Sequence, residues 1–315
     1  MIKVVGMMDD SILAFLSEEG IDSHLIEGVK AFRDKYRADE EMQTRIPSPE
    51  LFYYGKDVWK KALAALLAGE NLLLAGPKAT GKNVLAENLC AVFARPLWNV
   101  SFHINADAAY LIGTDTFNGE KVVFRPGPVY LCAVNGGFGV LDEINMAKNE
   151  ALAVLHSTLD FRHVIDVPGY DKIVVRPETR FIGTMNYGYA GTRELNEALT
   201  SRFAVLDMPL ISDEDLTKLL KRRFPSMRDQ ICGQFVRLFY ELANKAQNSE
   251  ISDRALDLRG LLDAISLFDK GLTSGDALDM CITNKTFDAY ERSLIHDVIS
   301  ARVPDSLTKG DVFTQ

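Results

Sequence analysis

The feature that most constrains the fold is a glycine-bounded loop set between an apolar run and a helical pattern. Residues 72–75 read Leu-Leu-Leu-Ala, residues 76–83 read Gly-Pro-Lys-Ala-Thr-Gly-Lys-Asn, and Val84 begins a helical pattern. A buried strand, a loop between two glycines and a lysine at a helix start form the layout of a phosphate-binding loop. We expect Gly76 and Gly81 to adopt backbone conformations that other residues resist. The loop N–H groups and the helix N-terminus would then converge on an anion.

Two residues at the end of this loop point to nucleotide chemistry. We expect Lys82 to reach the β- and γ-phosphates of a nucleotide, and the next position usually holds Ser or Thr, whose hydroxyl binds Mg²⁺. In this chain that position is Asn83. An amide oxygen is a competent ligand for a hard cation, so Asn83 is a candidate metal ligand, directly or through water. The alternative is a degraded loop that no longer binds a nucleotide.

Two later apolar runs end in polar side chains. Residues 138–141 lead into Asp142 and Glu143, and residues 181–185 lead into Asn186. Open α/β sheets bind their ligands at the carboxyl ends of the strands. We expect Asp142 to join the Mg²⁺ shell, Glu143 to polarise the attacking water and Asn186 to orient that water. An acidic pair also suits a helix N-terminus, but its place after a phosphate-binding loop favours the catalytic interpretation.

Three arginines are candidates for contacts with the transferring phosphate. Arg202 lies at a predicted helix end, where it can serve as a finger for the nucleotide of a neighbouring subunit, or simply complement the negative helix C-terminus. Arg193 is the competing candidate for the finger. Arg259 lies in the predicted C-terminal helical region, in the run Leu-Asp-Leu-Arg-Gly-Leu-Leu over residues 256–262.

Together these residues resemble the AAA+ ATPases, in which Walker A, Walker B, a sensor 1 Asn, an arginine finger and a sensor 2 Arg follow one another in this order. The resemblance covers roughly residues 50–300 and is closest to the MoxR-like and dynein-related group, with relatives in the rubisco-activase-like CbbQ and nitric-oxide-reductase-linked NorQ families. The branch rests on residues 142–145 (Asp-Glu-Ile-Asn), on residues 183–186 (Gly-Thr-Met-Asn) and on two hairpin insertions. Many MoxR-like members carry Arg after the first Asn, where this chain has Met146.

The resemblance implies an Mg²⁺-dependent ATPase with ATP and ADP as its nucleotides. It implies that Glu143, Asn186 and Arg202 are catalytic and that Asn83 and Asp142 bind the metal. The remaining nucleotide contacts that it implies come from the loop, the helix start and the lid: Gly76, Pro77, Lys78, Ala79, Thr80, Gly81, Lys82, Asn83, Val84 and Arg259. It also implies that Tyr53, Tyr54 and Val58 frame the adenine.

The same resemblance implies partners. Relatives assemble as rings, usually hexameric, and work with von Willebrand factor A-type partner proteins that they remodel or mature. Two other classes stay open: a nucleotide-gated switch or scaffold with little turnover, which Asn83 suggests, and the motor of a nucleic-acid-processing, restriction-type complex. The net charge of −9 disfavours a general nucleic-acid binder, because the phosphate backbone selects basic surfaces.

The pattern along the chain predicts an α/β fold with a parallel sheet, followed by a small all-helical domain. The resemblance implies that these are a P-loop AAA+ core and its lid domain. Near-continuous apolar runs suit parallel strands that are covered on both faces. We predict strands over residues 72–75, 97–100, 140–142, 181–185 and 205–208. We divide the chain into an N-terminal helical segment (1–50), the AAA+ nucleotide-binding domain (51–210) and the C-terminal helical lid (211–315).

Two hairpins are predicted as insertions in the α/β region. Asn118-Gly119 stands beside a β-branched and aromatic run, and this dipeptide is the strongest short hairpin signal because a type I′ turn needs positive φ twice. The second hairpin joins residues 163–167 and 172–175 through a Pro-Gly turn. In the resembling branch these correspond to the helix-2 insert and the pre-sensor-1 hairpin, which face the pore or partner side of a ring. Two ordinary surface hairpins are the alternative.

Cysteine, histidine and apolar-run patterns narrow the remaining classes. Cys90, Cys132, Cys232 and Cys281 are far apart, as expected of buried free thiols in a reducing compartment. The five histidines show no zinc-ligand spacing. The longest alanine-leucine run is too short to cross a bilayer, and acidic residues stand where a signal peptide needs positive charge. We therefore expect a cytoplasmic protein without a membrane span.

Overall fold

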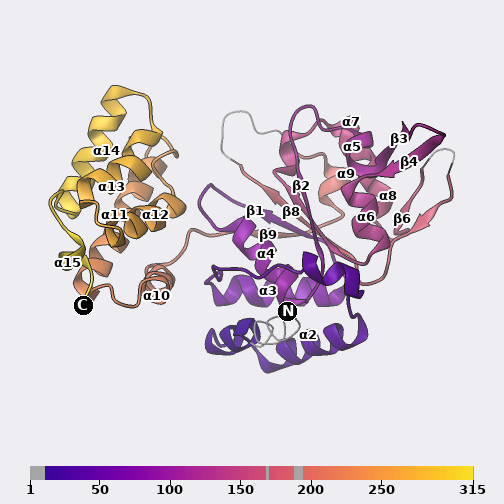
Figure 1. The fold of residues 1–315 in the computed structure, drawn as a ribbon, viewed down its shortest axis with the longest axis horizontal. Coiled ribbons are helices and arrows are strands. Elements are labelled where there is room, and N and C mark those ends of the chain that lie inside the picture. The colour runs from indigo at the N-terminus through magenta and orange to yellow at the C-terminus, as the bar shows by residue number, and fades with distance from the viewer. Residues whose placement is uncertain (1–10, 168–169, 188–193, 315) are drawn as a thin grey trace. The chain divides into compact units, whose positions relative to one another are not determined.

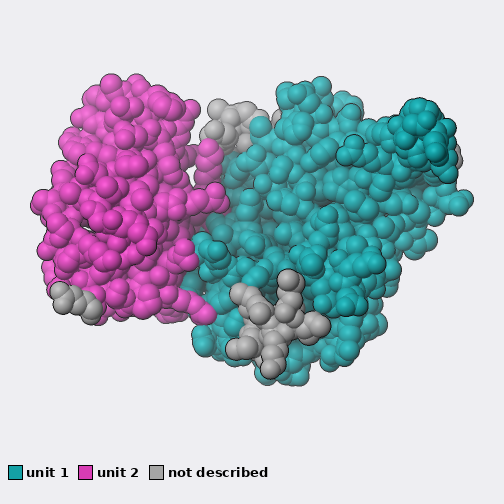
Figure 2. Space-filling model, viewed as in Figure 1, with its two compact units in different colours: residues 1–77, 81–209 teal, residues 78–80, 210–315 magenta. Residues whose placement is uncertain are grey.

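The computed structural model describes residues 11–167, 170–187 and 194–314. The chain forms two compact units, one of residues 1–77 and 81–209 and one of residues 78–80 and 210–315 (Figure 2). The first unit carries the sheet and the second unit is helical. The predicted division into an N-terminal segment (1–50), a nucleotide-binding domain (51–210) and a lid (211–315) was made on functional grounds, and it stays a prediction.

A five-stranded parallel sheet forms the centre of the first unit. Its strands are β1 (Leu72–Ala75), β2 (Leu97–Ser101), β5 (Phe138–Asp142), β8 (Arg180–Met185) and β9 (Ala204–Asp207). They are arranged in the order β2-β5-β8-β1-β9, and every neighbouring pair is parallel. The carboxyl ends of β5, β8 and β1 therefore lie side by side at one edge, as Figure 1 shows. The predicted α/β class, with its parallel sheet and helical C-terminal region, is confirmed.

Apolar side chains cover both faces of this sheet. Leu73 of β1 and Leu141 of β5 belong to a buried cluster shared with Val129 and Cys132 of α6 (Pro128–Val134). Successive side chains on a strand point to opposite faces, so Leu74, also fully buried, faces the other side. There α3 (Lys56–Ala68) and α4 (Lys82–Val92) pack on the strands (Figure 1).

The N-terminal helices attach to this core through arginine side chains. Arg33, near the end of α2 (Ser23–Lys35), donates from Nε to the carbonyl of Val92 at 2.7 Å and from Nη2 to that of Ala91 at 3.1 Å. These carbonyls end α4, where a cation satisfies the last acceptors. The other described helical segments of this unit are residues 11–18, η1 (Glu40–Arg45), α5 (Ala108–Ile112), η2 (Ile144–Met146), α7 (Asn149–Leu152), η3 (Ala153–Leu155), α8 (His156–Leu159) and α9 (Glu197–Thr200).

The first predicted hairpin is present, but its turn differs from the prediction. It pairs β3 (Gly113–Phe117) with β4 (Val122–Pro126) in antiparallel register. Gly119 has a φ of +100°, and neither Asn118 nor Glu120 has a positive φ. A type I′ turn needs two such residues, so that prediction was wrong. The Asn118 side chain instead accepts the backbone N–H groups of Glu120 and Lys121, at 3.1 and 3.0 Å.

The second hairpin is tied to the first. It pairs β6 (Val164–Ile165) with β7 (Ile173–Val174); Pro168 and Gly169 of its turn lie outside the described residues. Tyr170, which follows that turn, donates its hydroxyl to Asp115 Oδ1 of β3 at 2.5 Å. Its ring also lies 5.0 Å from that of Phe124 on β4, centroid to centroid. The two insertions are thus joined by a hydrogen bond and an aromatic contact.

The second unit is built from amphipathic helices. Its described helices are α10 (Asp213–Arg223), α11 (Asp229–Gln247), α12 (Leu258–Asp269), α13 (Ser274–Cys281), η4 (Thr283–Lys285), α14 (Ala289–Arg302) and α15 (Lys309–Val312). Ser212 caps α10 through the N–H of Asp215, with acidic residues in the first turn and basic residues in the last, which complements the helix dipole. Within the described residues, no helix has the length and apolar character needed to cross a membrane.

All four cysteines are free thiols, as predicted, and three of them are buried. Cys281 is only half-buried at the end of α13, so the expectation of burial was wrong for this residue. In the described part of the chain, no cluster of three or more His, Cys, Asp or Glu side chains is arranged to hold a metal ion.

Close packing of α12 against α13 gives a stability prediction. A methyl group added at Gly260 of α12 would lie 2.4 Å from the carbonyl oxygen of Cys281, so Gly260→Ala should destabilise the helical unit by roughly 1–3 kcal/mol. Gly233 of α11 is the matched control, since its nearest atom is 4.0 Å away. Gly233→Ala should stabilise by roughly 0.5–1 kcal/mol, because alanine loses less entropy in a helix. Thermal unfolding measures both, and equal shifts would contradict the packing argument.

Candidate functional site

The glycine-bounded loop connects β1 to α4 and has an unusual backbone. Gly81, the N-cap of α4, has a φ of +78°, and Ala79 has a φ of +62°. Gly76 has no positive φ, so the predicted conformational freedom applies to Gly81 and not to Gly76. Gly76 is needed for space, because a side chain there would lie 2.7 Å from the carbonyl oxygen of Met208. The left-handed residue that the sequence did not reveal is Ala79.

Lys82 lies buried across the start of its own loop. Its Nζ donates to the carbonyl of Gly76 at 3.0 Å and to that of Pro77 at 2.6 Å. Burial lowers the pKa of Lys82 to about 8, while the carboxylates of Asp142 and Glu143 act in the opposite direction. Carbonyl groups are neutral acceptors, and a phosphate oxygen would make a stronger, charge-assisted bond with the same ammonium group.

Asp142 and Glu143 lie where β5 ends, next to the end of β8. The hydroxyl of Thr184 on β8 donates to Asp142 Oδ1 at 2.6 Å and accepts the backbone N–H of Glu143 at 3.0 Å. Glu143 has a φ of +54° and a ψ of +44°, a left-handed conformation that is uncommon for a residue with a side chain. The turn after β5 thus presents the two acidic side chains in a fixed, strained geometry.

Asn186 and Glu143 are brought together from separate strands. Asn186 Nδ2 lies 3.4 Å from Glu143 Oε1. The carbonyl of Asn186 also accepts from Asn145 Nδ2 at 2.8 Å, and Asn145 is only 2% exposed. Asn145 and Thr184 both lie in motifs that the sequence analysis identified, but neither residue was assigned a role there. Both are polar residues that only the strand register places against the acidic pair.

The donor set at this edge fits a cation such as Mg²⁺ that takes most of its ligands from phosphates and water. Asp142 supplies a carboxylate whose Oδ1 is held by Thr184, and Asn83 stands exposed in the first turn of α4. Mg²⁺ is commonly bound through one or two carboxylates together with substrate phosphates. The small number of protein ligands therefore agrees with a nucleotide-bound cation.

Arg202 is held within its own chain. Its Nε donates to the carbonyl of His156 at 3.0 Å, and its Nη2 lies 3.2 Å from Asp160 Oδ2; Nη1 contacts the carbonyl of Ala198. The guanidinium of Arg162, and next that of Arg202, hold the pKa of Asp160 well below its usual range. Arg202 must leave these partners before it can reach the nucleotide of another subunit.

The two other candidate arginines have different environments. Arg259 is exposed in the first turn of α12, in the helical unit. Asp257, the N-cap of that helix, pairs with Lys285. Arg193 lies outside the described residues. The predicted phosphate contacts of both arginines stay predictions.

A buried asparagine that the sequence analysis did not single out holds the segment before α3 against α4. Asn88 of α4 is fully buried; its Oδ1 accepts the N–H of Tyr53 at 2.8 Å and its Nδ2 donates to the carbonyl of Leu51 at 2.9 Å. A methyl group built at Gly81 would lie 3.2 Å from the Tyr53 ring. Tyr53 therefore flanks the loop. Tyr54 and Val58, which follow Tyr53 in the sequence, are also buried. Their expected contact with adenine stays a prediction.

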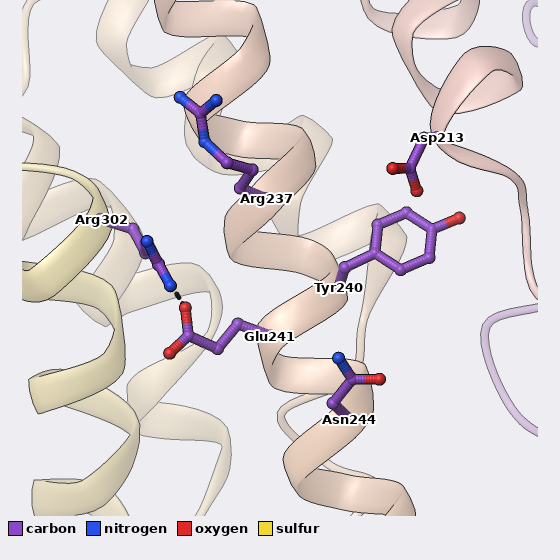
Figure 3. Close-up of a pocket in the computed structure, with 6 residues that line it drawn as sticks. All are labelled: Asp213, Arg237, Tyr240, Glu241, Asn244 and Arg302. Atoms are coloured by element: carbon purple, nitrogen blue, oxygen red, sulfur yellow. Dashed lines mark hydrogen bonds and ion pairs between the residues drawn. The ribbon is translucent and has the colours of Figure 1, made fainter.

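A separate hollow lies within the helical unit (Figure 3). Six residues line it: Asp213, Arg237, Tyr240, Glu241, Asn244 and Arg302. The figure shows Arg302 paired with Glu241, and the Tyr240 hydroxyl contacts the carbonyl of Ile211. None of the site residues predicted from the sequence lines this hollow, so it is distinct from the site at the sheet edge.

Comparison with known proteins places the site residues in context. Residues 71–203 match the family described as "AAA domain (dynein-related subfamily)". The uncharacterized protein YojN of Bacillus subtilis (strain 168) is 33% identical over 243 residues, which cover 75% of this chain and 79% of the relative. The uncharacterized protein SH1500 of Staphylococcus haemolyticus (strain JCSC1435) is 31% identical over 250 residues, 78% of this chain and 95% of the relative. The uncharacterized protein SAB1265c of Staphylococcus aureus (strain bovine RF122 / ET3-1) is 31% identical over 248 residues, which cover 77% of this chain and 94% of the relative.

The buried ammonium of Lys82 predicts that nucleotide affinity depends on pH. Phosphate oxygens favour the charged form of Lys82, whose pKa of about 8 means that binding at higher pH must first add a proton. The affinity for ADP should therefore fall as the pH rises above that value, by up to about tenfold per pH unit. Calorimetric titrations with ADP on both sides of this pH measure the effect. In Lys82→Arg, which stays charged, the slope should vanish; equal slopes would contradict the role of Lys82.

Proposed function

Because this chain belongs to the AAA domain family, in its dynein-related subfamily, we propose that it hydrolyses Mg·ATP and couples the reaction to the remodelling of a partner protein. The match over residues 71–203 includes the glycine-bounded loop, the acidic pair and Asn186. The observation that carries the proposal is the meeting of Lys82, Asp142, Glu143 and Asn186 at one edge of the sheet. Phosphoryl transfer needs this combination, since the protein mainly positions groups and neutralises charge.

In the proposed reaction, the loop and α4 bind the nucleotide. Lys82 exchanges its carbonyl partners for the β- and γ-phosphates, and the N–H groups at the start of α4 face the phosphate oxygens. Asp142, together with Asn83, would hold Mg²⁺, which when bound neutralises charge on the phosphates. Asp142 needs its second oxygen for this purpose, since Thr184 occupies the first.

Glu143 and Asn186 are proposed to act on the water. Glu143 accepts a proton from the water while the water oxygen forms the bond to the γ-phosphorus and the bond to the bridging β–γ oxygen breaks. Asn186, whose Nδ2 lies 3.4 Å from Glu143 Oε1, orients that water beside the carboxylate. The amide–carboxylate contact supports this pairing, because it brings the two groups within reach of the same water molecule.

The assembly and its partner are proposed from the family. We place the chain in the MoxR-like branch of this family, as a hexameric ring in the cytoplasm that acts on a von Willebrand factor A-type or other protein client. The joined hairpins β3–β4 and β6–β7 support a partner-facing role, since Phe117 and Val122, cross-strand neighbours at the first tip, are 68% and 63% exposed. Apolar side chains exposed together commonly mark interaction surfaces.

One observation favours a second candidate function. Asn83 stands exposed where a hydroxyl usually binds the metal, so a nucleotide-gated switch or scaffold with little turnover is the alternative. The steady-state rate of phosphate release under saturating Mg·ATP separates the two. The net charge of −9 gives no support to a motor acting on nucleic acid.

Replacing Glu143 should separate binding from chemistry. Glu143→Gln keeps an Oε1 for Asn186 but removes the charge that accepts the proton, so hydrolysis should fall by about 10²–10⁴-fold while ATP binding is retained. Phosphate release and a nucleotide titration measure the two effects. Lys82→Ala is the control, because it should lose binding itself. Loss of ATP binding in Glu143→Gln would mark Glu143 as structural.

Mixing two inactive variants should test the finger. Fingers supplied by a neighbour contribute about 10³–10⁵ in rate, so Arg202→Ala should be nearly inactive alone. Mixed with Lys82→Ala, some interfaces should pair an intact loop with an intact Arg202, and activity should partly return. The measurement is phosphate release as a function of the mixing ratio.

Arg259 provides the matched control for this mixture. If Arg259 acts on the nucleotide of its own chain, Arg259→Ala mixed with Lys82→Ala should recover no activity. Every chain with an intact Lys82 loop then also carries the Arg259→Ala substitution. Recovery with Arg259→Ala but not with Arg202→Ala would reverse the two assignments. Recovery with Arg193→Ala alone would transfer the finger to Arg193.

A further inference from the structure

A single buried hydroxyl contacts both acidic residues of the site. Thr184 is 1% exposed on β8. Its Oγ1 donates to Asp142 Oδ1 at 2.6 Å and accepts the N–H of Glu143 at 3.0 Å. Leu141 of β5 pairs with Gly183 of β8, so the parallel register places Asp142 directly beside Thr184. A hydroxyl has one proton to donate, and Thr184 gives that proton to Asp142 while it accepts the N–H of Glu143.

These two bonds act on different degrees of freedom. The bond to Asp142 fixes the rotation of that carboxylate and leaves its second oxygen for a cation. The bond from Glu143 holds the backbone N–H of a residue whose φ is +54°. This backbone conformation favours glycine, and a glutamate keeps it only where the surrounding structure holds it in place. Relaxation of that φ would swing the Glu143 side chain away from Asn186.

We propose that Thr184 is a positioning residue, which through one hydroxyl sets both the metal-facing carboxylate of Asp142 and the water-facing carboxylate of Glu143. The inference rests on the proposed ATPase function and adds a residue to it. Thr184 acts through the two acids, to which its hydroxyl is bonded. It thereby couples cation binding to the alignment of the general base.

A neighbouring contact supports this division of work. Asn145 Nδ2 donates to the carbonyl of Asn186 at 2.8 Å, so the segment after Glu143 is attached to the end of β8 a second time. This contact positions the backbone of Asn186 and does not involve Asp142 or the Glu143 N–H. Thr184, by contrast, hydrogen-bonds to both acidic residues.

The test compares Thr184→Ser with Thr184→Ala, which both lose the methyl group and differ only in the hydroxyl. Thr184→Ala should lose about 10–100-fold in the Mg²⁺ affinity of the ADP-loaded protein and in the rate of phosphate release. Thr184→Ser should recover most of both. ADP affinity without Mg²⁺ should stay close to wild type in both variants, since the loop is untouched. Calorimetric Mg²⁺ titration of ADP-loaded protein gives a readout that is independent of turnover.

The outcomes are distinguishable. Wild-type Mg²⁺ affinity and turnover in both the Ser and the Ala variant would overturn the inference. Equal losses in the two variants would also overturn it, because they would assign the effect to the methyl group. Thr184→Val, which restores the volume without the hydroxyl, should behave like Thr184→Ala; wild-type behaviour of the Val variant would also overturn it. A wild-type protein that binds Mg·ADP but shows no turnover would refute the proposed function, while the Mg²⁺ comparison would still decide the role of Thr184.

Discussion

The central place of β1 in the sheet is the constraint on which the site depends. Ala75 and Gly76 end this strand between two neighbours: Met208 donates its N–H to the carbonyl of Ala75 at 2.7 Å, and Gly76 donates to that of Met185 at 3.3 Å. With β8 and then β5 beside it, the loop that leaves β1 emerges next to the ends of both. A side chain at position 76 would push against the Met208 carbonyl and displace the loop from the edge where the acidic residues lie.

Much of the fold was accessible from the sequence because it is encoded locally. Five apolar runs predicted the five strands to within a few residues, and an apolar run long enough for one strand, flanked by turn residues, leaves few alternatives. The hairpin at Gly119 was also predicted, but its turn type was wrong, because Asn118 satisfies the turn with its side chain and keeps a negative φ. Such competition between side chain and backbone is not visible in a dipeptide.

The site was predicted in its parts and not in its connections. Lys82, Asp142, Glu143 and Asn186 each follow an apolar run, and the parallel sheet brings their strand ends together. Thr184 and Asn88 carry no such signal, since each is a single polar residue within an apolar segment whose partners are distant in sequence. The engagement of Arg202 with Asp160 is likewise a contact between separate segments, which spacing along the chain cannot reveal.

The contact of Tyr170 with the first hairpin has a mechanical consequence. A two-stranded hairpin on its own is compliant, and each of these insertions is only a pair of short strands. Because Tyr170 contacts Asp115 and Phe124, the two hairpins are mechanically coupled. A force applied at Phe117 is then transmitted through Tyr170 to β7, and from there along the chain to β8. The stiffness of the linked pair, and not that of either hairpin alone, then governs how far a displacement at the surface is transmitted toward β8 and Asn186, which follows that strand.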